Sequence, residues 1–196
     1  MGTKLSIRIL RVKCVDETNG KWVEKFGNDE IYLGGFSVMP NGDTSEILPS
    51  SIYPHFDDGD VKVFSPPKIF HTFSPVGEMN NEFAIGLILI EKDEGGATQA
   101  VQQITEKAQE LIKAGLATVG GLLGTAINFV IGPLLSHISK KIVVGVRDDL
   151  FLTQIVNVSI PHPGFTWSGS NHSAEKTLRI AGHGGIYELT YDWEFV

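Results

Sequence analysis

Apolar and polar residues alternate along much of this chain, as they do in β-strands that bury one face. Leu5, Ile7 and Ile9 set the pattern near the beginning, and the odd-numbered residues of the segment 187–195 repeat it at the end. Residues 82–91 contain FAIGLILI, a nearly continuous apolar run that predicts a strand buried on both faces. Turn-forming residues separate these segments, so we predict hairpin connections between antiparallel strands.

The hydrophobic period changes after residue 96. In the segment 97–113 the apolar residues Ala100, Val101, Ile104 and Ala108 follow helical spacing, with Gln, Glu and Lys between them. The pattern predicts a mainly β fold, an antiparallel β-sandwich of about seven or eight strands with one helical insertion. We place that insertion at about 97–138, within a single domain that covers 1–196.

The second half of the predicted insertion is unusual. No Asp, Glu, Lys, Arg or His occurs from Ala114 to Ser136, which is long enough to cross a bilayer as a helix. Gly120 and Gly124 have the small-xxx-small spacing of helices that pack closely in lipid, and a Gly-Pro pair interrupts the run. The residues that we assign to membrane insertion are Gly115, Gly120, Gly121, Gly124, Phe129, Gly132 and Pro133.

Two interpretations of this stretch are compatible. It packs as a buried helix against one sheet face, or it leaves that packing and enters a bilayer, because a soluble membrane-active protein must hide such a segment until release. We therefore predict a membrane-active effector or toxin-like protein whose partner is a lipid bilayer. The alternative is a non-catalytic structural or protein-interaction module, with calcium as a candidate ligand and a protein as its partner.

Composition narrows the function classes further. The 196 residues are 42% hydrophobic and 20% charged, as in globular proteins, and the net charge is −7. Because phosphate backbones repel an acidic chain, we expect no nucleic-acid partner. The single cysteine, Cys14, lies in an alternating run and is expected in the core. The N-terminus lacks the pattern of a signal peptide, so we expect synthesis in the cytoplasm. Export by a specialised secretion machine is compatible with this expectation. The sequence is also compatible with an oligomer.

Acidic residues gather at predicted turns. The candidate metal ligands are Asp57, Asp58, Asp60, Asp148 and Asp149. Calcium takes six to eight oxygen ligands, often carboxylates from several loops. Asp is also a common turn former, so the same residues are explained without metal. The expected cofactor is therefore none, or calcium.

Catalytic motifs are weak. The six histidines form no HExxH pattern, and no serine lies in a GxSxG motif. We expect no enzyme, although a hydrolase built on an Asp/Glu pair remains open because sequence spacing does not reveal carboxyl separation.

Two segments carry a resemblance. KCVDETNGKWVEKFGNDEIYLGG and VVGVRDDLFLTQ resemble a pattern of uncharacterised bacterial β-sandwich proteins, with an ET…GNDEIYL segment followed later by a DD-hydrophobic segment. The overall layout is similar to calcium-dependent phospholipid-binding β-sandwich domains, which implies acidic loops at one end of a sandwich. That likeness assigns no residue a role, and the long helical insertion departs from it.

Overall fold

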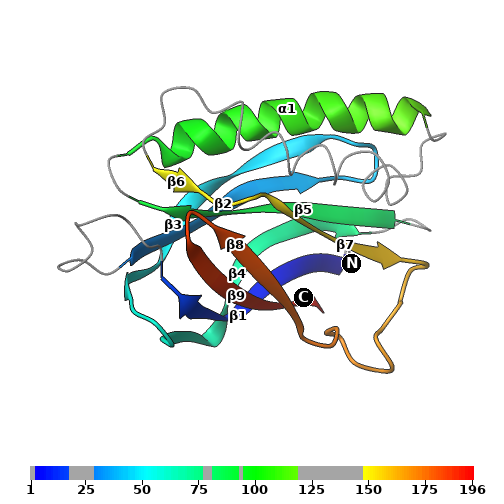
Figure 1. Ribbon diagram of the computed structural model, residues 1–196. Coiled ribbons are helices and arrows are strands. Elements are labelled where there is room, and N and C mark those ends of the chain that lie inside the picture. The colour runs from blue at the N-terminus through cyan, green and yellow to red at the C-terminus, as the bar shows by residue number, and fades with distance from the viewer. Residues whose placement is uncertain (1–2, 18–28, 77–80, 93–94, 119–147) are drawn as a thin grey trace.

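The computed structural model describes residues 3–17, 29–76, 81–92, 95–118 and 148–196. These residues form two layers of antiparallel strands, with one helix lying across the outside of one layer (Figure 1). The elements are β1 (Thr3–Asp16), β2 (Asp29–Val38), β3 (Thr44–Phe56), β4 (Val61–Val76), β5 (Asn81–Glu91), α1 (Ala97–Thr118), β6 (Asp149–Leu150), β7 (Gln154–Ile160), β8 (Lys176–Gly182) and β9 (Gly185–Phe195).

The strands are divided between two sheets. Sheet A has the order β4-β1-β9-β8, and sheet B has the order β3-β2-β5-β6, with β7 also pairing with β5. Every strand pair is antiparallel. The principal core lies between the sheets and joins residues from both, such as Leu5 and Trp193 of sheet A with Leu33 and Phe83 of sheet B. The predicted β-sandwich with a helical insertion is therefore confirmed.

Strand β5 is buried on both faces, as the run FAIGLILI predicts. Phe83, Ile85 and Leu87 belong to the core between the sheets, whereas Ile88 and Ile90 belong to a second apolar cluster on the outer face of sheet B. All of these side chains are at most 1% exposed. A strand in the middle of three layers has no solvent face, which explains why its sequence does not alternate.

Helix α1 provides the third layer. Val101, Ile104 and Ala108 form its buried stripe and belong to the outer cluster of sheet B. Two glycines allow the helix to approach the sheet. A Cβ atom on Gly34 of β2 would lie 3.0 Å from Val101, and one on Gly42 would lie 2.3 Å from the end of the Leu116 side chain. The helical period predicted for 97–113 is confirmed, and the helix continues to Thr118.

The segment after β2 differs from its prediction. The segment 47–67 is rich in Pro, Ser and Asp, which predicts irregular structure with one short strand near 61–64, and 68–73 predicts another strand. In the structure, 61–76 is the single long strand β4 and 44–56 is the long strand β3, each at the edge of a sheet. Most of β3 is exposed, and each strand carries prolines, Pro49 and Pro54 in β3 and Pro66 and Pro67 in β4. Proline on an edge strand blocks pairing with another chain. The apolar sequence KKIVVGV at 140–146 also predicts a strand, and it lies outside the described residues.

Strand β9 follows its predicted alternation. Tyr187, Leu189 and Trp193 are at most 1% exposed, and Tyr191 is 4% exposed. The strand forms a hairpin with β8 and lies beside β1 in the middle of sheet A. Val196, the residue after β9, is joined to the start of β1, because Lys4 and Val196 exchange both backbone hydrogen bonds. The two ends of the chain are therefore fastened to each other in one sheet.

Candidate functional site

The insertion leaves and re-enters the sandwich at one place, which we call the junction. The junction comprises Gly95 to Ala97, Asp148 to Phe151, and His183. Strands β5 and β6 are paired there, with Glu91 opposite Asp149, so both ends of the insertion meet side by side. The backbone amide of Phe151 donates to the carbonyl of Leu89 at 3.0 Å and extends this pairing. In Figure 1 the beginning of α1 lies over β6.

Asp148 fastens the beginning of α1. Its carboxylate accepts hydrogen bonds from the backbone amides of Gly95 at 2.7 Å and Ala97 at 3.0 Å. The carbonyl of Gly96 accepts the amide of Ala100, so Gly96 holds the position just before the first helical residue. The side chain of glycine offers no oxygen for the free amides of a helix end. Asp148 supplies that oxygen from the far end of the insertion, and it is only 6% exposed.

Charge adds to this contact. The first turn of α1 contains no acidic residue, so no local carboxylate balances the positive end of the helix dipole. The carboxylate of Asp148 does so from the returning strand. The sequence predicts Asp148 as a metal ligand, whereas the structure shows it as a helix cap. Nothing in the local sequence signals this role, because donor and acceptor are separated by about fifty residues.

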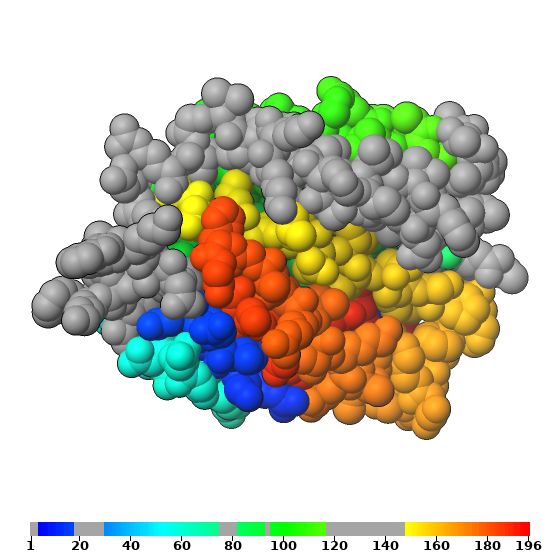
Figure 2. Space-filling model, in the orientation of Figure 1, coloured from blue at the N-terminus to red at the C-terminus, as the bar shows by residue number. Residues whose placement is uncertain are grey.

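His183 fastens the returning strand to sheet A. It lies in the two-residue turn between β8 and β9, and Nε2 donates to the carbonyl of Leu150 at 2.9 Å. Nδ1 lies 3.2 Å from a carboxylate oxygen of Asp149, and the ring of Phe151 packs edge-on at 5.9 Å between centroids. Figure 2 shows the end of this hairpin against the chain at the start of β6. The junction therefore links α1, sheet B and sheet A.

Asp149, like Asp148, belongs to the junction, whereas the three remaining predicted metal ligands lie elsewhere. Asp57, Asp58 and Asp60 lie in or beside the turn between β3 and β4. Asp58 accepts the amide of Glu17 at 2.8 Å, and Asp60 accepts the amide of Asp57 at 3.2 Å. These contacts are typical of acidic residues that stabilise a turn. Across the described ranges, no group of three or more His, Cys, Asp or Glu side chains is arranged to hold a metal ion.

The residues predicted for membrane insertion fall on both sides of the limit of description. Gly115 is buried in the last part of α1, beside Leu116, which packs against Gly42. Gly120, Gly121, Gly124, Phe129, Gly132 and Pro133 lie outside the described residues. Within the part of the chain that the structure describes, no helix is long and apolar enough to cross a membrane.

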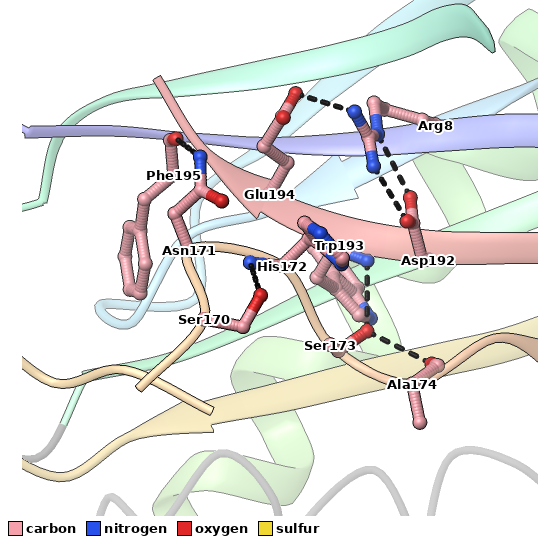
Figure 3. Close-up of polar contacts among 10 residues, drawn as sticks. All are labelled: Arg8, Ser170, Asn171, His172, Ser173, Ala174, Asp192, Trp193, Glu194 and Phe195. Atoms are coloured by element: carbon pink, nitrogen blue, oxygen red, sulfur yellow. Dashed lines mark hydrogen bonds and ion pairs between the residues drawn. The ribbon is translucent and has the colours of Figure 1, made fainter. Parts of the chain in front are cut away.

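The outer face of sheet A carries a cluster of ion pairs centred on Arg8 (Figure 3). Arg8 of β1 donates to both carboxylate oxygens of Asp192 on β9, at 2.9 and 2.6 Å, and reaches Glu194 at 2.8 Å. The hydrogen bond to Asp192 raises the pKa of Arg8 further, against the effect of partial burial. Asp192 is only 5% exposed in its side chain. Because the guanidinium of Arg8 pairs with both carboxylates, we interpret this arrangement as a structural ion-pair network. A catalytic acid–base pair would instead need two titratable groups in contrasting environments.

The segment before β8 lies beside the end of β9 in sheet A. The amide of Ser173 donates to the carbonyl of Trp193 at 2.8 Å, and its hydroxyl accepts the amide of the same residue at 3.0 Å. Asn171 continues the pairing through Phe195, whose amide donates to its carbonyl at 2.8 Å. Trp167 stacks on Phe195 with centroids 4.9 Å apart. The segment thus acts as a short extra strand beside the end of β9.

Comparisons with known proteins give few relatives. No protein-family model matches the chain, and no curated protein matches it. Among solved structures, it is similar to human GIVD cytosolic phospholipase A2 in complex with methyl γ-linolenyl fluorophosphonate inhibitor and terbium chloride, with a TM-score of 0.35 and 8% identity over 100% of this chain and 17% of that chain. A further structure, described as human GIVD cytosolic phospholipase A2, gives a TM-score of 0.31 and 9% identity over 99% of this chain and 16% of that chain. The chain thus spans about a sixth of that phospholipase, and a likeness at these TM-scores assigns no chemistry to it.

Proposed function

We propose that this protein associates with membranes, as an effector or toxin-like protein, through the apolar segment that follows α1. One observation supports this proposal above others. The principal core between the two sheets includes residues of every long strand but, among the described residues, none of the insertion. Both ends of the insertion also meet at one pair of strands. The described part of this core is therefore built without α1.

Helix α1 itself stays docked in this proposal. Its side chains Val101, Ile104 and Ile112 are at most 1% exposed against sheet B. Burying a side chain of this kind contributes about 1.5–3 kcal/mol, so undocking the helix would cost several such contributions at once. The lipid contact is therefore assigned to the residues after Thr118. From there to Ser136 the sequence contains no charged side chain and no histidine.

Vesicle flotation tests the proposal. The full chain is mixed with phosphatidylcholine vesicles, with and without phosphatidylserine, in the presence and absence of calcium and at neutral and acidic pH. The test variant is Phe129→Asp, which places a charge in the middle of the apolar segment. A charge at the centre of a membrane helix costs about 2.5–3.5 kcal/mol, so we expect vesicle binding to fall at least about 50-fold. The matched control is Leu48→Asp, since Leu48 is 64% exposed on β3 and lies outside the apolar segment.

The outcomes separate the two function classes. Binding that Phe129→Asp abolishes and Leu48→Asp preserves supports the membrane function. If the unaltered chain binds none of these vesicles, the membrane function is wrong and the alternative remains, a non-catalytic binding module. Calcium titration by calorimetry then tests the predicted ligands Asp57, Asp58 and Asp60 directly. Heat of binding that disappears in Asp58→Asn would support a calcium site in that turn.

A further inference from the structure

Strand β8 forms an open edge of sheet A. It pairs with β9 on one side, and no other described strand pairs with it. Lys176, Thr177 and Arg179 of this strand are exposed. Figure 2 shows the strand, in orange-red, uncovered on the side that faces the viewer. Sheet A therefore ends at β8 with one row of backbone groups that its own described strands leave unpaired.

The hydrogen-bonding pattern decides which backbone groups of β8 point outward. In an antiparallel ladder, every second residue of an edge strand bonds to the neighbouring strand. The tight turn at 183–184 places the even-numbered residues of β8 in hydrogen-bonded pairs with β9. The amides and carbonyls of Thr177, Arg179 and Ala181 therefore point away from β9. Among the described residues, no backbone group bonds to these three.

The other edges of the described sheets carry features that oppose pairing. Strand β3 contains Pro49 and Pro54, and β4 contains Pro66 and Pro67. Strands β6 and β7 share the remaining edge, where the segment 151–153 interrupts the strand. Such features protect edges, because an open edge is a template for another chain. The seven residues of β8 include no proline, and their register with β9 has no shift.

We propose that β8 pairs with β8 of a second copy of this chain, antiparallel, about a twofold axis at Leu178. This register sets Thr177 opposite Arg179 of the second copy on both sides of the axis, with about four backbone hydrogen bonds. The two Leu178 side chains, which already pack against the core, face each other. Arg179 keeps its ion pair with Glu188 of its own sheet, at 3.3 Å. The same surface is used twice, so the contact closes as a dimer.

Charge and space select this register. An axis at Arg179 would set two guanidinium groups opposite each other, and like charges in that position are destabilising. An axis at Ile180 would use the end of β8 where a Cβ atom on Gly182 would lie 3.1 Å from Phe151 of the neighbouring sheet. An axis at Thr177 would engage fewer residues of β8. Leu178 is therefore the axis that combines free backbone groups with an apolar pair.

Sedimentation equilibrium of the full chain tests the dimer. A strand pair of this length buries little surface, so we expect association between about 10 µM and about 1 mM. Arg179→Pro removes an outward amide, which an edge strand tolerates, and should weaken dimerisation at least about 10-fold because both copies lose a hydrogen bond. The control Arg179→Ala keeps that amide and should dimerise within about threefold of the unaltered chain.

Oxidative cross-linking tests the register and covers failure of the proline variant to fold. Leu178→Cys should form a linked dimer, because facing residues of a non-hydrogen-bonded pair lie about 4.5 Å apart between Cα atoms, within disulfide range. In Arg179→Cys the cysteines are diagonal neighbours about 7–8 Å apart, so linkage should be at least about 10-fold slower. Leu48→Cys, exposed on β3, is the control for random collision. Cys14 is buried in every chain.

Three results would overturn the proposal. The first is a chain that remains monomeric over the whole concentration range. The second is dimerisation that Arg179→Pro leaves unchanged, because the dimer would then use another surface. The third is cross-linking of Leu178→Cys that is no faster than that of Leu48→Cys. None of these results bears on vesicle binding, so the membrane function is tested separately.

Discussion

Replacing Asp148 by alanine is the most direct test of the junction. The carboxylate is 6% exposed and holds two backbone amides, at 2.7 and 3.0 Å. Hydrogen bonds to a charged group contribute about 1.5–3 kcal/mol each, whereas loss of a helix cap costs about 0.5–2 kcal/mol in total. Because this cap is buried and charged, we expect Asp148→Ala to lower the free energy of unfolding by about 2–4 kcal/mol.

Thermal and urea denaturation measure this loss. In a domain of this length, 1 kcal/mol shifts the melting temperature by about 2–4 °C, so a decrease of about 5–15 °C is expected. The control is Asp58→Ala, whose exposed carboxylate accepts one amide, from Glu17. We expect that control to lose less than about 1 kcal/mol. Asp148→Asn retains one acceptor oxygen, but its amide group meets a backbone donor, so an intermediate loss is expected.

Two results would refute this reasoning. If Asp148→Ala is within about 0.5 kcal/mol of the unaltered chain, the carboxylate does not stabilise the end of α1. If the loss occurs only when calcium is present and vanishes with a chelator, Asp148 acts as a metal ligand, as the acidic pattern of the sequence predicts, and the cap is secondary. Repeating the denaturation with calcium and with chelator therefore distinguishes the two roles.

Three further predictions concern the sandwich. Burial lowers the pKa of His71, so the unfolded chain binds more protons at this residue than the folded chain does. The urea midpoint should therefore fall as pH drops below about 6.5, and it should fall less steeply in His71→Asn. An equal slope in the two chains would contradict this prediction. Arg8→Met leaves Asp192 buried without its partner and should lower the free energy of unfolding by about 3–5 kcal/mol, as measured by thermal denaturation. Adding Asp192→Leu should restore most of that stability, and no recovery would contradict the pairing. Gly86→Ala places a Cβ 2.2 Å from the Phe36 ring and should cost about 1–3 kcal/mol, relieved in part by Phe36→Leu; a variant of normal stability would contradict the contact.

Elements with a strong apolar period were predictable from the sequence. The alternation of 187–195 predicts β9, and the continuous run of 82–91 predicts a strand with two buried faces. The period of 97–113 likewise predicts α1 and its buried stripe. In each case a solvent-excluded face dictates the residue type at fixed intervals, so the fold class follows from local pattern.

Strand β3 lacked such a signal. It lies at the edge of sheet B with most of its side chains exposed, and it is held by backbone pairing to β2. Backbone hydrogen bonds impose no apolar period, and Pro49 and Pro54 resemble loop residues. An exposed edge strand is therefore read as irregular structure until its partner strand is known.

The junction was predictable only in part. The sequence predicts Asp148 and Asp149 as candidate metal ligands, but their partners in the structure are the amides of Gly95 and Ala97 and the ring of His183. Arg8 and Asp192 are still further apart along the chain, and they meet because β1 and β9 pair in register. Contacts of this kind depend on topology, which a single sequence does not specify.

The two outer faces of the sandwich differ in what covers them. Sheet A carries ion pairs on its outer face, Arg8 with Asp192 and Arg179 with Glu188 at 3.3 Å, and also exposed apolar side chains on β4, such as Val63 and Ile69. The outer face of sheet B is apolar and is covered by α1. Removing α1 would expose the second cluster as a contiguous apolar patch, which soluble monomers avoid. Undocking α1 would therefore expose apolar surface, and the junction contacts of Asp148 and His183 are where both ends of the insertion are joined to the two sheets.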